Sequence, residues 1–177
     1  MNRAQMVLVR FDDAEYRLCC ALNRAAAHLW LRCLFRAASR LGDGALWYSM
    51  LIVLPLIYGA SAIRPVLVMA ATGLCGLLVY KGLKSTLVRE RPFVRHPSIT
   101  QEMMPLDRYS FPSGHTLHAV CFTWQAVAHF PSLFWGLVPA AILIALSRVV
   151  LGLHYLTDVL AGAAIGAVLA TCGLALT

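Results

Sequence analysis

The sequence predicts an all-α, integral-membrane helical bundle, and two of its features support that fold class. Of the 177 residues, 60% are hydrophobic and only 13% are charged, whereas an average soluble domain has about a quarter of its residues charged. The apolar residues also gather into five stretches of about 18 to 23 residues, near the roughly 20 that a helix needs to cross a bilayer. We therefore expect a single domain, 1–177, that is embedded largely in lipid.

The first 44 residues differ from the rest because arginines recur along them at helical spacing. The arginines that share one side of a helical wheel are Arg17, Arg24, Arg32, Arg36 and Arg40. This pattern carries too much charge to span a membrane and favours one or two amphipathic helices in the headgroup region. A cap packed on the bundle is the alternative, and both can hold. Leu41-Gly42-Asp43-Gly44 is the expected turn into the bundle.

The transmembrane core is expected at 45–177, with about five membrane-spanning helices. The expected spans are Ala45–Ala62, Pro65–Gly82, Ser113–Phe130, Ser132–Leu151 and His154–Leu176. Three glycines in the last span, Gly162, Gly166 and Gly173, predict close helix packing. The polar segment from about Arg89 to Ser110 is expected to lie over the membrane surface.

Three short polar blocks interrupt the apolar stretches. They are Lys84-x6-Arg91-Pro92, Pro112-Ser113-Gly114-His115, and Ser147-Arg148-x5-His154-x3-Asp158. If the spans alternate in direction, all three blocks lie at the same membrane face. Lone basic residues at helix ends are usually anchors that reach the headgroups, and we interpret Lys81 and Arg89 in this way. Arg148 fits that interpretation poorly because nothing near it in 145–151 is charged, which indicates a functional site.

These blocks supply the groups that a phosphate ester needs for hydrolysis. Lysine offers a point charge and arginine a planar fork for phosphate oxygens. Ser113 can cap a helix whose free N–H groups bind an anion, although an ordinary N-cap turn has the same pattern. His154 and Asp158 share a helix face, so that the carboxylate can orient the imidazole or simply satisfy it. His154 as nucleophile and His115 as acid would permit in-line displacement at phosphorus without a metal. The sequence lacks the cluster of carboxylates that two-metal catalysis would need.

The three blocks resemble the signature motifs of the type 2 phosphatidic acid phosphatase (PAP2) superfamily, which also includes vanadium haloperoxidases. They match K-x6-R-P, P-S-G-H and S-R-x5-H-x3-D without a substitution, over roughly residues 84–158. The resemblance is to the bacterial membrane lipid phosphatase branch, although many bacterial members have six spans. Here the arginine-rich helices take the place of the first span.

The resemblance implies a role for each matching residue. The phosphate-binding residues would be Lys84, Arg91, Arg148, Ser113 and Gly114. His154 would attack phosphorus to form a phosphohistidine, and Asp158 would orient His154. His115 would protonate the leaving group and could then activate water. The resemblance implies neither a metal nor another cofactor.

The leading hypothesis is a membrane lipid phosphate phosphatase that hydrolyses a phosphomonoester or diphosphate headgroup. Candidate substrates are phosphatidylglycerophosphate, phosphatidate and undecaprenyl diphosphate. A vanadate-dependent haloperoxidase is one alternative, which the apolar composition disfavours. A catalytically idle protein that binds anionic lipid is another, which the complete set of both histidines and Asp158 disfavours.

We expect a multi-pass protein of the inner or plasma membrane whose partners are the bilayer and a lipid phosphate, with no nucleic acid. The sequence does not indicate an oligomeric state. In the five-span arrangement, every lysine and arginine except Arg64 falls at the site face. The positive-inside rule would then place the site in the cytoplasm. The resemblance favours the outer face, which is the periplasmic one in bacteria, and that is our expectation.

Overall fold

The computed structural model describes residues 3–177, with side chains from Asp12 onward, and these residues form helices joined by loops without any strand. The elements are α1 (Arg3–Asn23), η1 (Arg24–Ala27), α2 (Leu29–Arg40), η2 (Leu41–Ala45), α3 (Leu46–Tyr58), η3 (Gly59–Ala62), α4 (Ile63–Thr86), α5 (Pro92–Arg95), α6 (Gly114–His129), η4 (Pro131–Leu133), α7 (Phe134–Val150) and α8 (Leu156–Leu174). The predicted all-α fold class is confirmed.

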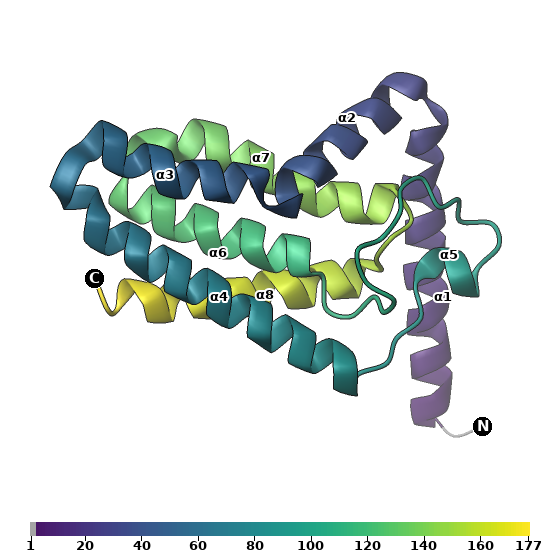
Figure 1. Cartoon of the computed structure of the whole chain (residues 1–177). Coiled ribbons are helices and arrows are strands. Elements are labelled where there is room, and N and C mark those ends of the chain that lie inside the picture. Colours follow the sequence, from purple (N-terminus) through teal and green to yellow (C-terminus); the bar gives the residue numbers. More distant parts are fainter. Residues whose placement is uncertain (1–2) are drawn as a thin grey trace.

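Five helices run side by side as a bundle, and α1 crosses its end (Figure 1). The bundle consists of α3, α4, α6, α7 and α8, with α6 packed against α4, α7 and α8. Buried side chains from α3, α4, α6 and α7 form the main core. In that core the rings of Trp47 and Phe122 stack with their centroids 5.5 Å apart.

The bundle helices lie where the five spans were expected. By length and composition, three helical stretches of the described chain could cross a membrane: Leu29–Thr86, Pro131–Val150 and Leu156–Leu174. The first is a run of 58 residues that contains α2, α3 and α4. Because α6 has only 16 residues, the number of membrane crossings stays a prediction.

Glycines bring α6 and α8 into backbone contact. A Cβ added to Gly162 would lie 2.4 Å from the carbonyl oxygen of Ser113, and one added to Gly166 would lie 2.4 Å from that of Leu117. The starts of the two helices therefore adjoin, and the N–H of Ser113 donates to the carbonyl of Asp158 at 3.0 Å. This packing places the second polar block beside the third.

The N-terminal segment forms the two helices α1 and α2, which are separated at 24–28. A kink at Gly44, where φ is 135°, turns the chain from α2 into α3. Arg32 and Arg36 of α2 pair with Glu102 of the polar loop, at 3.6 and 3.2 Å. Part of α2 therefore packs on the bundle as a cap, which was the alternative to a helix in the headgroup region.

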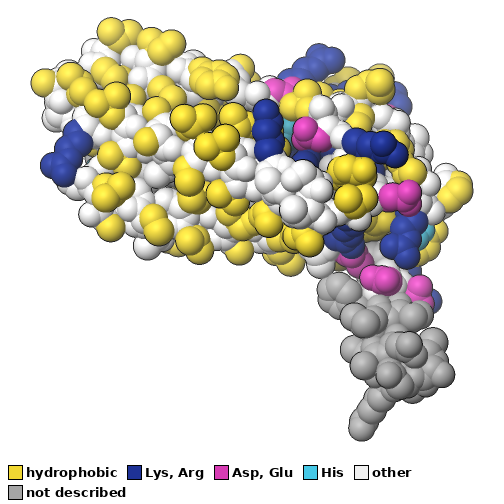
Figure 2. All heavy atoms as spheres, turned by 60° about the horizontal axis from the view of Figure 1, so that its bottom comes forward, with side chains coloured by type: hydrophobic (Ala, Val, Ile, Leu, Met, Phe, Trp, Pro, Cys, Tyr) yellow, Lys and Arg dark blue, Asp and Glu magenta, His cyan; other side chains and the backbone are white. Residues whose placement is uncertain are grey.

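The surface divides into an apolar bundle and a charged end. Figure 2 shows hydrophobic side chains over most of the bundle, whereas Lys, Arg, Asp and Glu gather near the end where α1 crosses. Many large apolar side chains are exposed on the bundle, among them Leu56, Leu67 and Trp135. Such a surface suits contact with lipid.

Candidate active site

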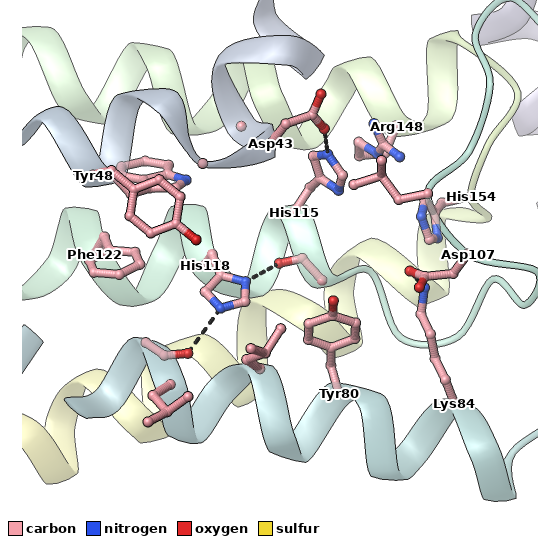
Figure 3. A pocket seen from close by; sticks show the side chains of 18 of the residues that line it. Asp43, Tyr48, Tyr80, Lys84, Asp107, His115, His118, Phe122, Arg148 and His154 are labelled. Carbon is pink, nitrogen blue, oxygen red and sulfur yellow. Dashed lines mark hydrogen bonds and ion pairs between the residues drawn. The ribbon is translucent and has the colours of Figure 1, made fainter. Parts of the chain in front are cut away.

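A cavity of about 290 Å³ lies at the charged end of the bundle and extends between α3 and α4. At one end its lining includes Lys84, Arg91, Asp107, His115, Arg148 and His154, and at the other Trp47, Leu51, Leu74, Leu77 and Phe122. Figure 3 shows the charged side chains pointing toward one another from α4, α6, α7 and two loops. The structure thus brings residues from all three polar blocks to one polar pocket with an apolar extension.

Three cations at this end are almost completely buried. The exposed fractions are 7% for Lys84 and 2% each for Arg91 and Arg148. Arg91 donates to the carbonyl of Leu153 at 2.6 Å and to that of Asp107 at 3.0 Å, and burial lowers its pKa to about 10. Arg148 donates to the hydroxyl of Ser39, while its Nε has no hydrogen-bond partner among the described residues. Desolvated cations with so few carboxylate partners favour the binding of an anion.

His154 lies in the turn before α8 and is 1% exposed. Burial, and then the positive charges of neighbours led by Arg148 and Arg91, hold the pKa of this imidazole well below its usual range. The ring is therefore neutral near pH 7, as a nitrogen nucleophile must be. Its Nε2 lies 3.4 Å from Nη1 of Arg91, which places this nitrogen toward the cavity.

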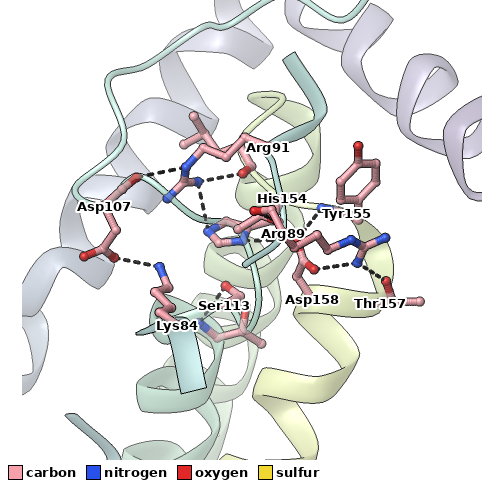
Figure 4. Close-up of polar contacts among 12 residues, drawn as sticks. Lys84, Arg89, Arg91, Asp107, Ser113, His154, Tyr155, Thr157 and Asp158 are labelled. Carbon is pink, nitrogen blue, oxygen red and sulfur yellow. Dashed lines mark hydrogen bonds and ion pairs between the residues drawn. The ribbon is translucent and has the colours of Figure 1, made fainter. Parts of the chain in front are cut away.

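Asp158 faces the other imidazole nitrogen from the first turn of α8. Its Oδ2 lies 3.5 Å from Nδ1 of His154, which is longer than an ordinary hydrogen bond. Contacts of this kind in catalytic sites commonly shorten when substrate binds. The same Oδ2 accepts the N–H of Tyr155 at 2.9 Å, and Oδ1 accepts from Arg89 at 2.7 Å (Figure 4).

The interpretation of Arg89 as a membrane anchor is wrong. Its guanidinium donates to Asp158 at 2.7 Å, to the hydroxyl of Thr157 at 2.7 Å and to Glu15 at 2.6 Å. It also lies 4.0 Å from the centre of the Tyr155 ring. An arginine near a helix end has the same sequence pattern whether its side chain contacts lipid headgroups or a carboxylate. The sequence pattern alone therefore could not identify the partners of Arg89.

Ser113 and Gly114 occupy the start of α6. Ser113 is fully buried, and its hydroxyl accepts the N–H of Thr116 at 3.4 Å, as an N-cap does. It does not belong to the cavity lining, whereas Gly114 does. A Cβ at Gly114 would come within 3.3 Å of the Tyr80 ring. Of these two expected phosphate ligands, only Gly114 therefore borders the cavity.

His115 pairs with an acidic residue that the sequence interpretation treated only as part of a turn. Its Nε2 lies 2.5 Å from Oδ1 of Asp43, in the kinked segment before α3. In Figure 3 the ring lies between Asp43 and the side chains of Arg148 and His154. The signal available in sequence was an acidic residue between two glycines, at the expected site end of a span.

Asp107 and His118, which lie outside the three polar blocks, also line the cavity. Asp107 accepts a hydrogen bond from Lys84 at 2.7 Å. His118 has its Nδ1 2.9 Å from the carbonyl of Gly114 and its Nε2 3.1 Å from that of Gly73. Asp107 therefore provides the cation cluster with a carboxylate, and His118 ties α4 to α6 in the wall of the cavity.

Curated relatives and a solved structure resemble this chain. Phosphatidylglycerophosphatase B of Bacillus subtilis is 34% identical over 108 residues, which are 52% of this chain and 48% of that protein. Undecaprenyl-diphosphatase BcrC of the same species is 31% identical over 114 residues, which are 64% of this chain and 58% of that protein. The chain thus spans about half the length of the curated relatives that it matches.

The crystal structure of LpxE from Aquifex aeolicus superimposes with a TM-score of 0.77 at 26% identity, covering 90% of this chain and 93% of the other. The likeness therefore covers more of the chain than the matches to the two curated relatives do. Residues 61–176, which carry all three polar blocks, match the model of the PAP2 superfamily. The chain belongs to the PAP2 superfamily.

Proposed function

We propose that this protein is a metal-independent lipid phosphate phosphatase of the membrane, acting through a phosphohistidine on His154. The observation that carries the proposal is the two-part cavity, with buried cations and histidines at one end and apolar side chains at the other. Such a cavity suits a substrate with an anionic phosphate and a hydrocarbon tail.

The apolar half of the cavity supports a lipid as the substrate. Its walls come from α3 and α4, where Tyr48 is 68% and Leu74 58% exposed. These side chains therefore border both the cavity and the outer surface of the bundle. An acyl or prenyl chain can pass this wall into the bilayer while its headgroup remains among the cations.

The first chemical step transfers the phosphoryl group to the protein. Lys84, Arg91 and Arg148 neutralise the equatorial oxygens, which is the main requirement of phosphoryl transfer. Nε2 of His154 attacks phosphorus as the bond from phosphorus to the ester oxygen breaks. His115 gives its proton to the departing oxygen.

The second step regenerates the imidazole of His154. His115, now neutral, takes a proton from water as the water oxygen attacks phosphorus and the bond to Nε2 breaks. Inorganic phosphate leaves, and His115 again carries the proton for another cycle. The 2.5 Å contact with Asp43 supports this role, because a carboxylate stabilises the protonated imidazole that His115 must carry before the first step and regains in the second.

Candidate substrates are phosphatidylglycerophosphate, phosphatidate and undecaprenyl diphosphate. Two of them correspond to the names of relatives, phosphatidylglycerophosphatase B and undecaprenyl-diphosphatase BcrC. Another relative is named lipid A 1-phosphatase, from Rhizobium johnstonii. These names share a phosphate on a membrane lipid, and we propose that class with the site on the outer face of the membrane.

Phosphate release from a lipid panel tests the proposal. The purified protein in mixed micelles is assayed against the three candidate lipids, with glycerol 3-phosphate as a control that lacks a tail. We expect release from at least one lipid, a far slower reaction with glycerol 3-phosphate, and no change when EDTA is added. His154→Ala should retain less than about a hundredth of the rate. Release that stops with EDTA and returns with magnesium or zinc would overturn the metal-free mechanism.

Inhibition by oxyanions provides a second measurement on the same preparation. Five-coordinate vanadate bound to His154 would mimic the in-line transition state, so vanadate should inhibit far more strongly than phosphate. Equal inhibition by vanadate and sulfate would mean that the cavity is only a general anion trap.

A further inference from the structure

Glu15 of α1, which lies outside the three polar blocks, forms a partly buried ion pair with Arg89 and also contacts the start of α8. Glu15 of α1 is 7% exposed, and its Oε2 accepts from Nη2 of Arg89 at 2.6 Å. Its Oε1 accepts the backbone N–H of Thr157 at 2.8 Å and also the hydroxyl of Thr157. One carboxylate thus holds both the arginine and the residue next to Asp158.

Arg89 continues this contact to the nucleophilic pair. Its Nη1 donates to Oδ1 of Asp158 at 2.7 Å, and its guanidinium lies 4.0 Å from the Tyr155 ring centre. The second oxygen of Asp158 is then left for the N–H of Tyr155 and for Nδ1 of His154. Figure 4 shows Arg89, Asp158 and His154 side by side.

The contact with Arg89 offsets the cost of burying the charged carboxylate of Asp158. Asp158 is fully buried, and a buried carboxylate must have a partner to remain charged. Burial lowers the pKa of Arg89, but the charges of Asp158 and Glu15 outweigh that effect and raise it above its usual range. Arg89 is therefore a permanent cation, and its planar fork contacts two carboxylates at once, which a lysine cannot reproduce.

We propose that Glu15 and Arg89 are positioning residues for the reaction: Arg89 fixes the carboxylate of Asp158 against His154, and Glu15 fixes Arg89. The role rests on the proposed phosphatase function. Neither residue lines the cavity, so neither contacts the phosphate. Because Glu15 shares the guanidinium, Asp158 keeps more of its negative charge for the imidazole.

The test uses the full-length variants Glu15→Gln and Arg89→Gln and the double variant. Each single variant should lower kcat at least tenfold while KM changes less than about twofold, because the groups that hold the phosphate remain. The double variant should lose no more than Arg89→Gln alone, since residues that act through one contact are not additive. If the losses of kcat in the two single variants multiply in the double variant, the two residues act independently, and the proposal that Glu15 acts through Arg89 is overturned.

The pH profile separates positioning from simple loss of packing. The groups that face His154 are Lys84, Arg91, His115, Arg148 and Asp158. All five remain in these variants, so the change in nearby charge comes from the substituted residue alone. Loss of the Arg89 cation should move the acid limb of kcat/KM to higher pH, and loss of the Glu15 anion should move it to lower pH. A looser fold would not shift the acid limbs of the Arg89→Gln and Glu15→Gln variants in opposite directions. Shifts of both acid limbs in the same direction would overturn the proposal.

Glu102→Gln is the matched control. Glu102 also joins the N-terminal segment to the polar loop, through its ion pairs with Arg32 and Arg36, but it does not line the main cavity. Its loss should leave kcat, KM and the pH profile unchanged. A tenfold fall in kcat for this variant would mean that any weakened N-terminal contact reduces activity, which would overturn a specific role for Glu15. Thermal unfolding of all variants confirms that each is folded.

Two substrates keep the inference separate from the proposed function. Every variant is assayed with a lipid phosphate and with para-nitrophenyl phosphate, which reports phosphatase chemistry without a tail. If the wild type hydrolyses only the second substrate, the lipid proposal fails and the Glu15–Arg89 inference is still measured. If it hydrolyses the lipid phosphate and Glu15→Gln matches the wild type, only the inference fails. A wild type that hydrolyses neither substrate overturns both.

Discussion

Arg148 offers a strict test of the proposed phosphate-binding site. It is 2% exposed, and its Nη1 donates to Ser39 while Nε has no partner among the described residues. Lysine keeps the charge at this position but not the planar fork. Arg148→Lys should therefore lower kcat/KM at least tenfold, equivalent to about 1.4 kcal/mol of barrier. Steady-state kinetics on the purified variant measure this loss.

Arg95→Lys is the control for that substitution, because Arg95 is exposed on α5 and does not line the cavity. Its activity should equal that of the wild type. Arg89→Lys is unsuitable as the control, since Arg89 contacts two carboxylates. Equal losses in the Arg148 and Arg95 variants would contradict a phosphate fork at Arg148.

The depressed pKa of His154 predicts the acid side of the pH profile. The free protein should lose kcat/KM only well below pH 6.5, the usual pKa of a histidine, because protonation of Nε2 removes the nucleophile. The unfolded chain binds this proton more readily, so the free energy of unfolding should also fall as pH drops below about 6.5. An acid limb above pH 6.5 would contradict a neutral, desolvated His154.

The residue types and spacing of the polar blocks made their residues predictable from the sequence. The residues that form hydrogen bonds and ion pairs with them were not predictable in this way. Arg148 and the His154–Asp158 pair stand out because charge is rare in apolar sequence and because the pair is four residues apart. The expectation that this pair shares a helix face is wrong, since His154 lies in the turn before α8 and only Asp158 lies in the helix. Glu15 has no such local signal, since its partner Arg89 lies 74 residues away. Asp43 has only its place between two glycines, which does not indicate that its partner is His115, 72 residues away. Only the packing of α1 and of the kink before α3 makes those contacts.

The backbone contact between α6 and α8 makes two glycines structurally essential. A side chain at Gly166 would meet the carbonyl of Leu117, which cannot move without disturbing α6. Gly166→Val should therefore cost about 1–3 kcal/mol, or roughly 2–4 °C of unfolding midpoint per kcal/mol. Thermal unfolding in detergent measures this shift.

Gly136→Val in α7 provides the comparison, because nothing lies within 4 Å of a Cβ at Gly136. Its unfolding midpoint should stay near that of the wild type. A drop equal to that of Gly166→Val would mean that valine is unfavourable in any of these helices, whatever its contacts.

The bundle helices were easier to predict than the N-terminal ones. Long apolar runs fix α4, α7 and α8 because a bilayer demands both their length and their composition. The break at 24–28 has no proline or glycine to mark it, and it arises where α1 turns across the bundle end. The arginine wheel correctly indicated helices, but it could not show that Arg36 pairs with Glu102.

Which membrane face carries the site can be measured on the intact molecule. Met104, 80% exposed in the polar loop, and Ser61, exposed in η3 at the far end of the bundle, are replaced singly by cysteine. The background chain has its six native cysteines removed. With the site on the outer face, a membrane-impermeant maleimide should label Met104→Cys in intact cells and Ser61→Cys only after permeabilisation. The reverse pattern would place the site in the cytoplasm, as the positive-inside rule alone predicts.

The contacts of α1 also constrain when the protein can first act during its synthesis. Glu15 leaves the ribosome 142 residues ahead of Thr157, its partner at the start of α8. His154 and Asp158 emerge with that same segment, after Lys84 of α4 and Arg148 of α7 have been made. A nascent chain therefore has the buried cations before it has the His154–Asp158 pair, and the proposed reaction can begin only once α8 has been made and has met α1.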